Sequence, residues 1–441
     1  MLTIKRVPTV VSNYQEESSE KVGGCGRNCL GQCCLPLSEL PLYAFKRDTE
    51  NSSENGVVIA SDKQPQISCF LYNLLLAEWE DRKNQGLFRY NVTACETKII
   101  PSKYGFIAQL NEGRHNKKRP TEFRVDKVLQ PFDENKFNFT KIGQEEVLFR
   151  FEPSNDNKSH FFSSAPLSAD SSSPSVVAIN VSPIEYGHVL LIPRVLDCLP
   201  QRIDHECFLL ALHMAKEAAD PFFRLGYNSL GAFATINHLH FQAYYLLMPF
   251  PIEKAFTRRI NTAKGLQDRG VKVLQLLDYP VRGLVFEAEN SMKDLSDVVA
   301  RSCIFLQNDN IPFNVLIADC GQIVFLFPQC YAEKQALGKV SQELLDTHVN
   351  PAVWEISGHI VLKRKKDFED LSEAYASRLL AEVSLSEERF QEVKAYILEA
   401  ANLQEKANME DNGINQEEDS PCKIPCRQNP SHLPQDCVVL H

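Results

Sequence analysis

Two histidines and a glutamine stand at alternate positions in the segment Asn237-His238-Leu239-His240-Phe241-Gln242. The residues around them predict a β-strand from 238 to 247, and side chains two positions apart on a strand point to the same face. His238, His240 and Gln242 would therefore share one face of an otherwise apolar strand. Burying three polar side chains in a row costs free energy unless each has a polar partner. The segment thus indicates a site for a polar ligand.

A histidine in such a site can act as a covalent nucleophile on a phosphate. A neutral imidazole nitrogen is nucleophilic near pH 7, and a phosphoramidate is labile enough to turn over. The neighbouring histidine and the glutamine can hold phosphate oxygens as charge develops on them. A glutamine donates a hydrogen bond but cannot serve as a base for water, which favours transfer over hydrolysis. The same spacing also fits two structural histidines or two zinc ligands, and the residues alone leave these alternatives open.

The elements that must position this segment form an alternating pattern on both sides of it. A helical pattern covers residues 70–79, and a Ser-rich spacer at 154–175 predicts a loop. The segments that follow predict strands at 176–181 and 188–192, a helix within 201–220, and a strand at 225–229. The expected order before and including the histidine segment is strand, strand, helix, strand, strand.

The second half of the chain repeats this theme loosely. We expect a hairpin of strands at 313–318 and 323–327, a helix at 333–346, a strand at 354–362, and helices at 368–380 and 386–400. The run Gly358-His359-Ile360-Val361-Leu362 echoes Gly187-His188-Val189-Leu190-Leu191, which suggests an internal duplication. We therefore expect an N-terminal arm (1–55), a catalytic unit (56–250), a second, degenerate unit (251–401) and an acidic disordered tail (402–441).

Residues 176–247 resemble the histidine triad superfamily, and His-x-His-x-Gln resembles its galactose-1-phosphate uridylyltransferase branch. The run from Gly187 to Arg194 is similar to the family's first-strand signature, and Asn228-Ser229-Leu230-Gly231 is similar to its nucleotide-contacting segment. The resemblance implies that His240 is the nucleophile, that His238 orients it or binds phosphate, and that Gln242 assists. The substrate- and phosphate-binding residues that it implies are His188, Asn228, Thr235, Asn180 and Arg194. It implies an α+β fold of two histidine-triad-like units, antiparallel sheets with packed helices, that form an intramolecular pseudo-dimer.

The chain as a whole, to about residue 385, resembles the GDP-hexose phosphorylases of plants. The similar segments are Cys25-Gly26-Arg27-Asn28-Cys29-Leu30-Gly31, the run from Arg119 to Val128, and the run from Val353 to His359. This resemblance implies guanylyl transfer from GDP-L-galactose to inorganic phosphate in ascorbate synthesis, without a cofactor. The alternatives are a related substrate, GDP-D-glucose or a dinucleoside polyphosphate, and a non-catalytic guanine-nucleotide-binding regulatory protein.

Three further clusters have a functional and a structural interpretation. Cys25-x3-Cys29-x3-Cys33-Cys34 could bind a metal, but the spacing is not that of a zinc ribbon. We interpret these cysteines as reduced thiols on an arm that packs on the body, and predict no metal site. The basic run from Arg114 to Arg119 is interpreted as a solvated face, with a phosphate contact as the alternative. The run from Lys363 to Lys366 is a weak nuclear-import signal.

Composition limits the partners and the compartment. The net charge of -10 argues against bulk affinity for nucleic acid or an anionic membrane, although a small anionic substrate remains compatible with it. We find no apolar run long enough to span a bilayer and no signal-peptide core at the start. We therefore expect a cytoplasmic protein, with the nucleus as a second location, that acts on a small molecule. The oligomeric state stays open.

Overall fold

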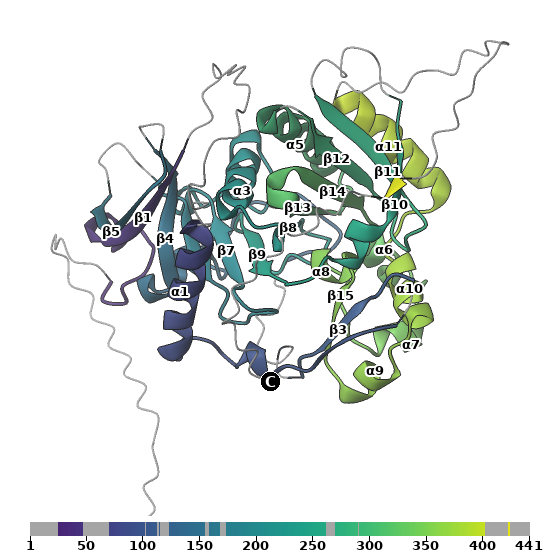
Figure 1. Cartoon of the computed structure of the whole chain (residues 1–441), viewed down its shortest axis with the longest axis horizontal. Helices are drawn as coiled ribbons and strands as arrows, with labels where there is room; N and C mark the ends of the chain where they lie inside the picture. The colour runs from purple at the N-terminus through teal and green to yellow at the C-terminus, as the bar shows by residue number, and fades with distance from the viewer. Residues whose placement is uncertain are drawn as a thin grey trace, which may run out of the picture.

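One large sheet crosses the whole molecule, and a small sheet lies against it (Figure 1). The computed structural model describes residues 25–46, 70–101, 103–112, 114, 123–154, 158–167, 173–261, 270–289, 291–401 and 422–423. The 13 strands of the large sheet are β1 (Glu39–Phe45), β4 (Val147–Pro153), β5 (His160–Pro166), β6 (Val176–Ile179), β7 (Val189–Ile192), β8 (Phe223–Asn228), β9 (Phe241–Tyr245), β10 (Phe256–Arg259), β11 (Val271–Leu277), β12 (Leu284–Ala288), β13 (Phe313–Ala318), β14 (Ile323–Pro328) and β16 (Cys422–Lys423). The small sheet consists of β2 (Thr97–Ile99), β3 (Ile107–Leu110) and β15 (His359–Leu362). The predicted α+β class is confirmed.

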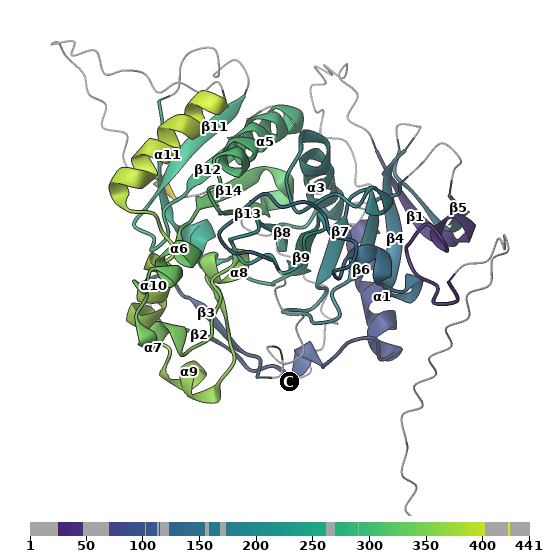
Figure 2. The same cartoon turned by 180° about the vertical axis from the view of Figure 1, so that it is seen from behind.

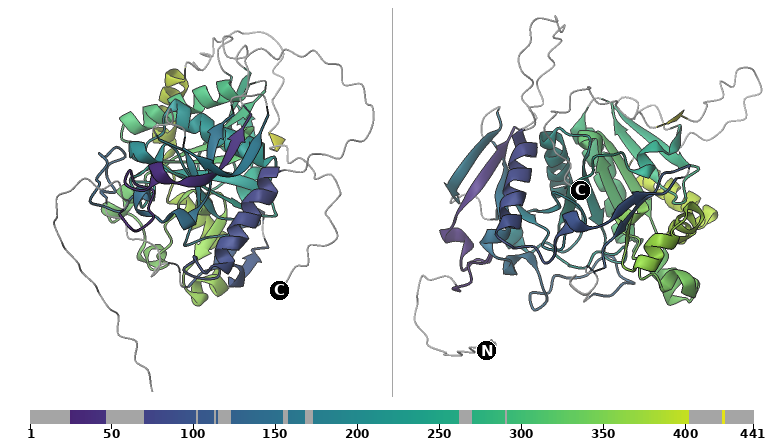
Figure 3. Two further views of the ribbon diagram at one scale, coloured as in Figure 1. Left: turned by 90° about the vertical axis from the view of Figure 1, so that its left-hand side faces the viewer. Right: turned by 60° about the horizontal axis from the view of Figure 1, so that its bottom comes forward.

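The helices divide between the two faces of the large sheet. They are α1 (Phe70–Asn84), α3 (His205–Ala218), α5 (Met292–Asn308), α6 (Tyr331–Ala336), α7 (Gln342–Leu345), α8 (Val353–Ile356), α9 (Lys365–Asp370), α10 (Glu373–Ala381) and α11 (Glu387–Ala400). The apolar sides of α1, α3, α5 and α11 build the largest core on one face. The small sheet and α6 to α10 build a second core on the other face. Figure 2 shows β2, β3, α7, α9 and α10 gathered at one end of the molecule, and the right-hand view of Figure 3 shows the yellow-green helices together at one side.

The large sheet has the same strand order on both sides of its centre, where β8 pairs with β13. Outward from the centre the order is β8-β9-β7-β6-β4 on one side and β13-β14-β12-β11-β10 on the other. Every pair within these two sets is antiparallel. In the first set α3 connects β7 to β8, and in the second set α5 connects β12 to β13. The two helices pack on each other. The two halves therefore share one topology.

The prediction that the two Gly-His runs are copies of each other is not supported by this topology. His359 begins β15, which lies in the small sheet and pairs in parallel with β3. The strand that corresponds to β7 in the second half is β12, and the one that corresponds to β9 is β14. The short sequence similarity between 187–191 and 358–362 therefore joins two segments that occupy different places in the fold.

Several predicted elements are confirmed, and others begin or end elsewhere. The hairpin of β13 and β14, the helix α1 and the helix α11 lie where they were expected. The strand predicted at 238–247 begins only at Phe241, because the main-chain groups of Leu239 and His240 bond to Leu199 and to the Gln201 side chain. The spacer at 154–175, predicted as a loop, contains β5, which pairs with β1.

Three predictions in the second half were wrong. The helix at 333–346 is interrupted between α6 and α7. The strand at 354–362 is divided, because Trp354 lies in α8, which Glu355 caps by accepting a hydrogen bond from Ala352 N at 3.1 Å. The helix at 368–380 is two helices, since Ser372 caps a new one, α10, through the Tyr375 amide.

The expected N-terminal arm supplies β1, which pairs with β4 and β5 of the large sheet. Other parts of the arm, the basic residues Lys117 to Arg119 and most of the expected acidic tail lie outside the described residues. Within the described segments, no helix combines the length and the apolar character needed to cross a membrane.

Candidate active site

A cavity of about 350 Å³ lies where the predicted histidine segment meets the second half of the chain. Its first-half wall comes from β6, β8, β9 and the loop around η3 (Phe139–Lys141). Its second-half wall comes from α8, β15 and the residues beside them. The predicted residues that line it are Asn180, Asn228, Thr235, His240 and Gln242. Five of the eight predicted site residues therefore meet in one place.

His240 has its ring fixed by the backbone. Its Nδ1 lies 2.8 Å from the main-chain oxygen of His238, and because a carbonyl oxygen only accepts, Nδ1 is the donor. Nε2 is then the nitrogen with the lone pair. Burial lowers the pKa of His240 to about 4, so the ring is neutral near pH 7. A neutral, oriented imidazole on a cavity wall is the form of histidine that can attack phosphorus.

His238 lies behind the cavity wall and does not line it. Its Nδ1 accepts a hydrogen bond from Phe139 N at 3.1 Å, which places the ring proton on Nε2. That Nε2 is buried and has no hydrogen-bond partner among the described residues. Burial lowers the pKa of His238 to about 3, and the neighbouring His240 adds to this effect. The geometry supports an orienting role, because the His238 carbonyl fixes the His240 ring.

His188 also supports the cavity from behind. Its side chain is fully buried, Nδ1 accepts from Ile184 N at 2.8 Å, and Nε2 lies 3.2 Å from the side-chain amide of Asn180. It also bonds Gln242, whose Oε1 accepts from Trp354 Nε1 at 3.3 Å. Burial, with a smaller contribution from the charge of Arg114, holds the pKa of His188 well below its usual value. His188 therefore positions two residues that line the cavity.

Asn228 lines the cavity from the last position of β8, close to the centre of the large sheet. Its Oδ1 accepts from Asn314 Nδ2 at 2.6 Å and from Val353 N at 3.0 Å. Both donors come from the second half of the chain, so that half fixes the amide and leaves Nδ2 to donate to a ligand. Thr235 lies on the same wall.

Arg194 lies away from the cavity. It forms ion pairs with Asp204, at 3.2 Å, and with Glu206, at 3.1 Å, and both acids lie at the start of α3. It is not among the residues that line the cavity. The predicted phosphate contact of Arg194 therefore has no support in its surroundings.

Other cations line the cavity instead. These are Arg89, Arg114 and Lys363, against the carboxylates of Glu146 and Glu355. Arg114 Nη1 is buried and has no hydrogen-bond partner in the described part of the chain. Burial lowers the pKa of Lys363, and the charge of Arg114 contributes. With the histidines neutral, the cavity has an excess of positive charge, which suits an anionic ligand.

Sequence reasoning missed two residues that support the site. Gln201 is 1% exposed, and its side chain bonds both main-chain groups of His240 and the carbonyl of Asn228. Trp354 reaches the cavity because Gly226 faces it, where a Cβ would approach the Trp354 ring within 3.0 Å. No local pattern identifies either residue, since both act through contacts between distant segments. The basic runs that begin at Arg114 and Lys363 were visible, but their first residues looked like surface charges.

Comparisons with known proteins show the family of the chain. Residues 70–244 match the family described as GDPGP1-like, N-terminal domain, and residues 251–404 match GDPGP1-like, C-terminal domain. The chain belongs to the GDPGP1-like family. Among its relatives, GDP-L-galactose phosphorylase 1 of Arabidopsis thaliana is 65% identical over 432 residues, which cover 98% of this chain and 94% of the relative.

More distant members and a solved structure are also similar. GDP-D-glucose phosphorylase 1 of Homo sapiens is 33% identical, with 75% of this chain and 84% of the relative covered. The crystal structure of yeast Ap4A phosphorylase Apa2 in complex with AMP is 15% identical, with a TM-score of 0.47 over 72% of this chain and 98% of that one.

Proposed function

We propose that this GDPGP1-like chain is a GDP-L-galactose phosphorylase. It transfers the guanylyl group of GDP-L-galactose to inorganic phosphate and gives L-galactose 1-phosphate and GDP. Its reaction is the step in ascorbate synthesis that the plant resemblance implies. The observation that carries the reaction class is the neutral, backbone-oriented His240 on the wall of a cavity with excess positive charge. The choice of hexose rests on the 65% identity with the plant phosphorylase, against 33% with the human GDP-D-glucose enzyme.

The reaction has two displacements at the same phosphorus. In the first, His240 Nε2 attacks the phosphorus next to guanosine, a P–N bond forms, and the P–O bond to hexose 1-phosphate breaks. In the second, an oxygen of inorganic phosphate attacks the guanylyl-histidine, the P–N bond breaks, and GDP leaves. The His240 ring becomes neutral again with its Nδ1–H still bonded to the His238 carbonyl. No cofactor takes part in either step.

The other residues of the cavity bind and orient the phosphates. Gln242, Asn180, Asn228 and Thr235 offer polar groups around His240. Arg114 offers a guanidinium whose Nη1 has no hydrogen-bond partner among the described residues. Charge on the non-bridging oxygens grows in each transition state, so fixed donors stabilise that state more than the bound substrate. His188 and His238 keep these groups in place.

The two matching halves of the large sheet support a description as two histidine-triad-like units that form an intramolecular pseudo-dimer. We place the catalytic unit at 56–250 and the second, degenerate unit at 251–401, between the expected arm and tail. The second unit contributes no histidine to the cavity wall within the described residues, but it supplies Trp354, Glu355 and Lys363. We propose a cytoplasmic location. Because Lys363 lines the cavity, the support for the 363–366 run as a nuclear-import signal is weaker than the sequence alone suggests.

Trapping the covalent intermediate tests this proposal directly. The chain is mixed with GDP-L-galactose labelled in the guanylyl group, without phosphate, and denatured in alkali, where phosphoramidates of histidine survive. We expect label on a peptide that contains His240, release of hexose 1-phosphate, and loss of the label when phosphate is added before quenching. Full labelling of His240→Asn would show that another residue is the nucleophile.

A substrate panel separates the candidate functions. With phosphate as the acceptor, turnover is compared for GDP-L-galactose, GDP-D-glucose and a dinucleoside polyphosphate. A higher kcat/KM for GDP-D-glucose would reassign the hexose, which the human relative at 33% identity makes the second candidate. No release of hexose 1-phosphate from any of them would favour a regulatory nucleotide-binding protein.

A further inference from the structure

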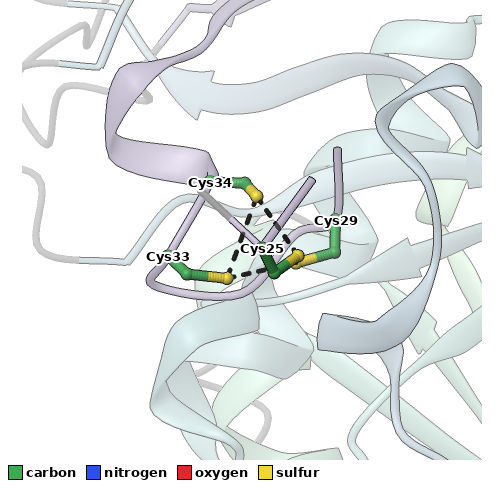
Figure 4. A group of neighbouring side chains, drawn as sticks. All are labelled: Cys25, Cys29, Cys33 and Cys34. Carbon is green, nitrogen blue, oxygen red and sulfur yellow. Dashed lines mark hydrogen bonds between the residues drawn. The ribbon is translucent and has the colours of Figure 1, made fainter. Parts of the chain in front are cut away.

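Four cysteine side chains converge at one point near the start of the described chain (Figure 4). The Sγ atoms of Cys25, Cys29, Cys33 and Cys34 all lie within 4.8 Å of one another. Four of the separations form a closed ring: 3.5 Å for 25–29, 3.5 Å for 25–34, 3.6 Å for 29–33 and 3.8 Å for 33–34. All four cysteines are free thiols.

These separations match a tetrahedral metal site. A zinc–sulfur bond is about 2.3 Å long, so the edge of a regular ZnS₄ tetrahedron is about 3.8 Å. A disulfide requires about 2.05 Å between sulfurs, and a pair of adjacent cysteines such as Cys33 and Cys34 is poorly placed to form one. Uncharged thiols bond one another only weakly, so their own attraction does not account for four of them at a single point.

The backbone around the thiols is arranged to hold them. Gly31 N donates to Cys29 Sγ at 3.4 Å, an N–H···S bond of the kind that stabilises a thiolate. Cys34 N and Leu35 N both donate to the Gly31 carbonyl at 3.0 Å, which turns the chain back on itself and brings Cys33 and Cys34 over Cys29. Cys34 is buried, whereas Cys25 and Cys33 are exposed, so an ion could reach the site from solvent.

We propose that Cys25, Cys29, Cys33 and Cys34 bind one Zn²⁺ ion in a structural tetrathiolate site. Zinc suits four thiolates in tetrahedral geometry, and a site with four protein ligands has no open position for catalysis. The four ligands are all cysteines, and His238 and His240 are not among them. The spacing of the four cysteines is irregular for a zinc ribbon, which is why the sequence alone did not favour this interpretation.

The cysteine site lies next to the loop at 139–146, which forms one wall of the candidate active-site cavity. The cysteine segment is bonded to the loop at 139–146: Leu30 N donates to Ile142 O at 3.3 Å, Gln144 N to Asn28 O at 2.8 Å, and Gln144 Nε2 to Cys29 O at 3.1 Å. Leu30 packs in the same small core as Phe139 and Ile142. Phe139, Ile142 and Glu146 line the cavity, and the Phe139 amide holds the His238 ring. Zinc would thus fix the loop from which one wall of the cavity is built.

Metal content tests the proposal on the full chain. The protein is produced without an affinity tag in zinc-supplemented medium, dialysed against buffer, and measured by elemental analysis. We expect about one zinc per chain in the wild type and in the control Cys320→Ser, whose cysteine lies in the turn between β13 and β14. Cys33→Ser, a substitution at an exposed position, should lose most of the zinc. Wild-type protein without zinc, or Cys33→Ser with the full amount, overturns the proposal.

A second measurement on the wild type does not depend on the folding of a variant. The chain is refolded with Co²⁺ in place of zinc, and its absorption spectrum is recorded. Four thiolates give strong sulfur-to-cobalt charge transfer and intense visible bands of tetrahedral Co²⁺, which Zn²⁺ should abolish on titration. A weak octahedral spectrum, two disulfides within residues 25–34, or iron in place of zinc in the purified protein each contradicts the assignment.

Discussion

His240 Nδ1 donates to the main-chain carbonyl of His238 across 2.8 Å, so the two histidines of the motif are coupled through the backbone and not through their rings. Gln201 holds the same residue from its main-chain side. Its Oε1 accepts from His240 N at 3.0 Å, and its Nε2 donates to His240 O at 3.2 Å. The direction of the His240 ring is therefore set by hydrogen bonds that involve the polypeptide backbone.

Replacing Gln201 should displace His240, although Gln201 itself does not line the cavity. Gln201→Leu removes these two bonds and the one to the Asn228 carbonyl. We expect kcat to fall about tenfold to a hundredfold, because small misplacements of a reacting group have effects of this size, while KM changes by less than about threefold. Unsatisfied main-chain groups should also lower the free energy of unfolding by about 1–3 kcal/mol. Gln335→Leu, at an exposed position of α6, is the control, and an unchanged kcat in a folded Gln201→Leu protein would contradict a positioning role.

Arg114 and Arg194 make opposite predictions for substrate binding. Arg114 lines the cavity, and its Nη1 has no hydrogen-bond partner within the described segments, whereas Arg194 pairs with Asp204 and Glu206 outside the cavity. A charge-assisted hydrogen bond contributes about 1.5–3 kcal/mol, so Arg114→Met should raise KM for GDP-hexose about tenfold to a hundredfold. Arg194→Met should change it by less than about threefold, by the same reasoning. Equal effects of the two substitutions would restore the phosphate-binding role that the sequence suggested for Arg194.

Fluorescence can report on the cavity because the chain has only two tryptophans. Trp354 lines the cavity, and Trp79 is buried in α1 against Phe88 and Tyr186. We expect GDP to change the tryptophan emission, with the change retained in Trp79→Phe and lost in Trp354→Phe. Titration of each variant with GDP measures this. A signal that persists without Trp354 would place the nucleotide elsewhere.

Stability should depend steeply on pH below neutrality. Burial lowers the pKa of His238 to about 3 and those of His240 and His359 to about 4, from 6.5, and lowers that of His188 well below 6.5. Between these values and 6.5 the unfolded chain binds protons that the folded chain does not, so stability falls as the pH falls. Burial also raises the pKa of Glu185 to about 7. Between pH 4.5 and 7 the folded chain therefore binds up to one proton at Glu185 that the unfolded chain does not, which offsets part of the effect of the histidines.

Burial also raises the pKa of Glu152, Asp220 and Glu287, which works in the same sense as Glu185, and we expect the four buried histidines to outweigh these carboxyls near pH 5. Urea unfolding between pH 5 and 7 measures the slope, and His359→Gln should reduce it by about one proton. A flat profile would mean that these rings take up protons in the folded state. His240 should stay neutral between pH 5 and 7, because its pKa of about 4 lies below this range. We therefore expect protonation of His240 not to reduce the activity there.

The sequence predicted best where one strong local pattern was enough. The helix α1 and the hairpin of β13 and β14 follow from periodicity, and the His-x-His-x-Gln motif pointed to a residue, His240, that lines the cavity. Alternation correctly grouped His240 with Gln242, but it also placed His238 on the cavity, where the bond from Phe139 N turns its ring away from that wall. His238 lies before β9, which begins at Phe241, so strand alternation does not determine the direction of its ring.

The remainder depended on contacts between distant segments. The sequence predicted a strand from Trp354, whereas Trp354 lies in the short helix α8, where Glu355 accepts a hydrogen bond from Ala352 N. Arg114 and Lys363 begin basic runs that look solvated, and the folded chain directs both to the cavity. Four irregularly spaced cysteines form a compact group only after the turn at Gly31 brings them together.

Because the two halves of the large sheet match, each half could in principle hold its own active site. The strand that corresponds to β9 is β14, and it is preceded by Asp319-Cys320-Gly321-Gln322 where β9 is preceded by His238 and His240. The second half therefore offers no imidazole at the equivalent place. A burst of hexose 1-phosphate should reach an amplitude of one per polypeptide, and a single chain should show no cooperativity between sites.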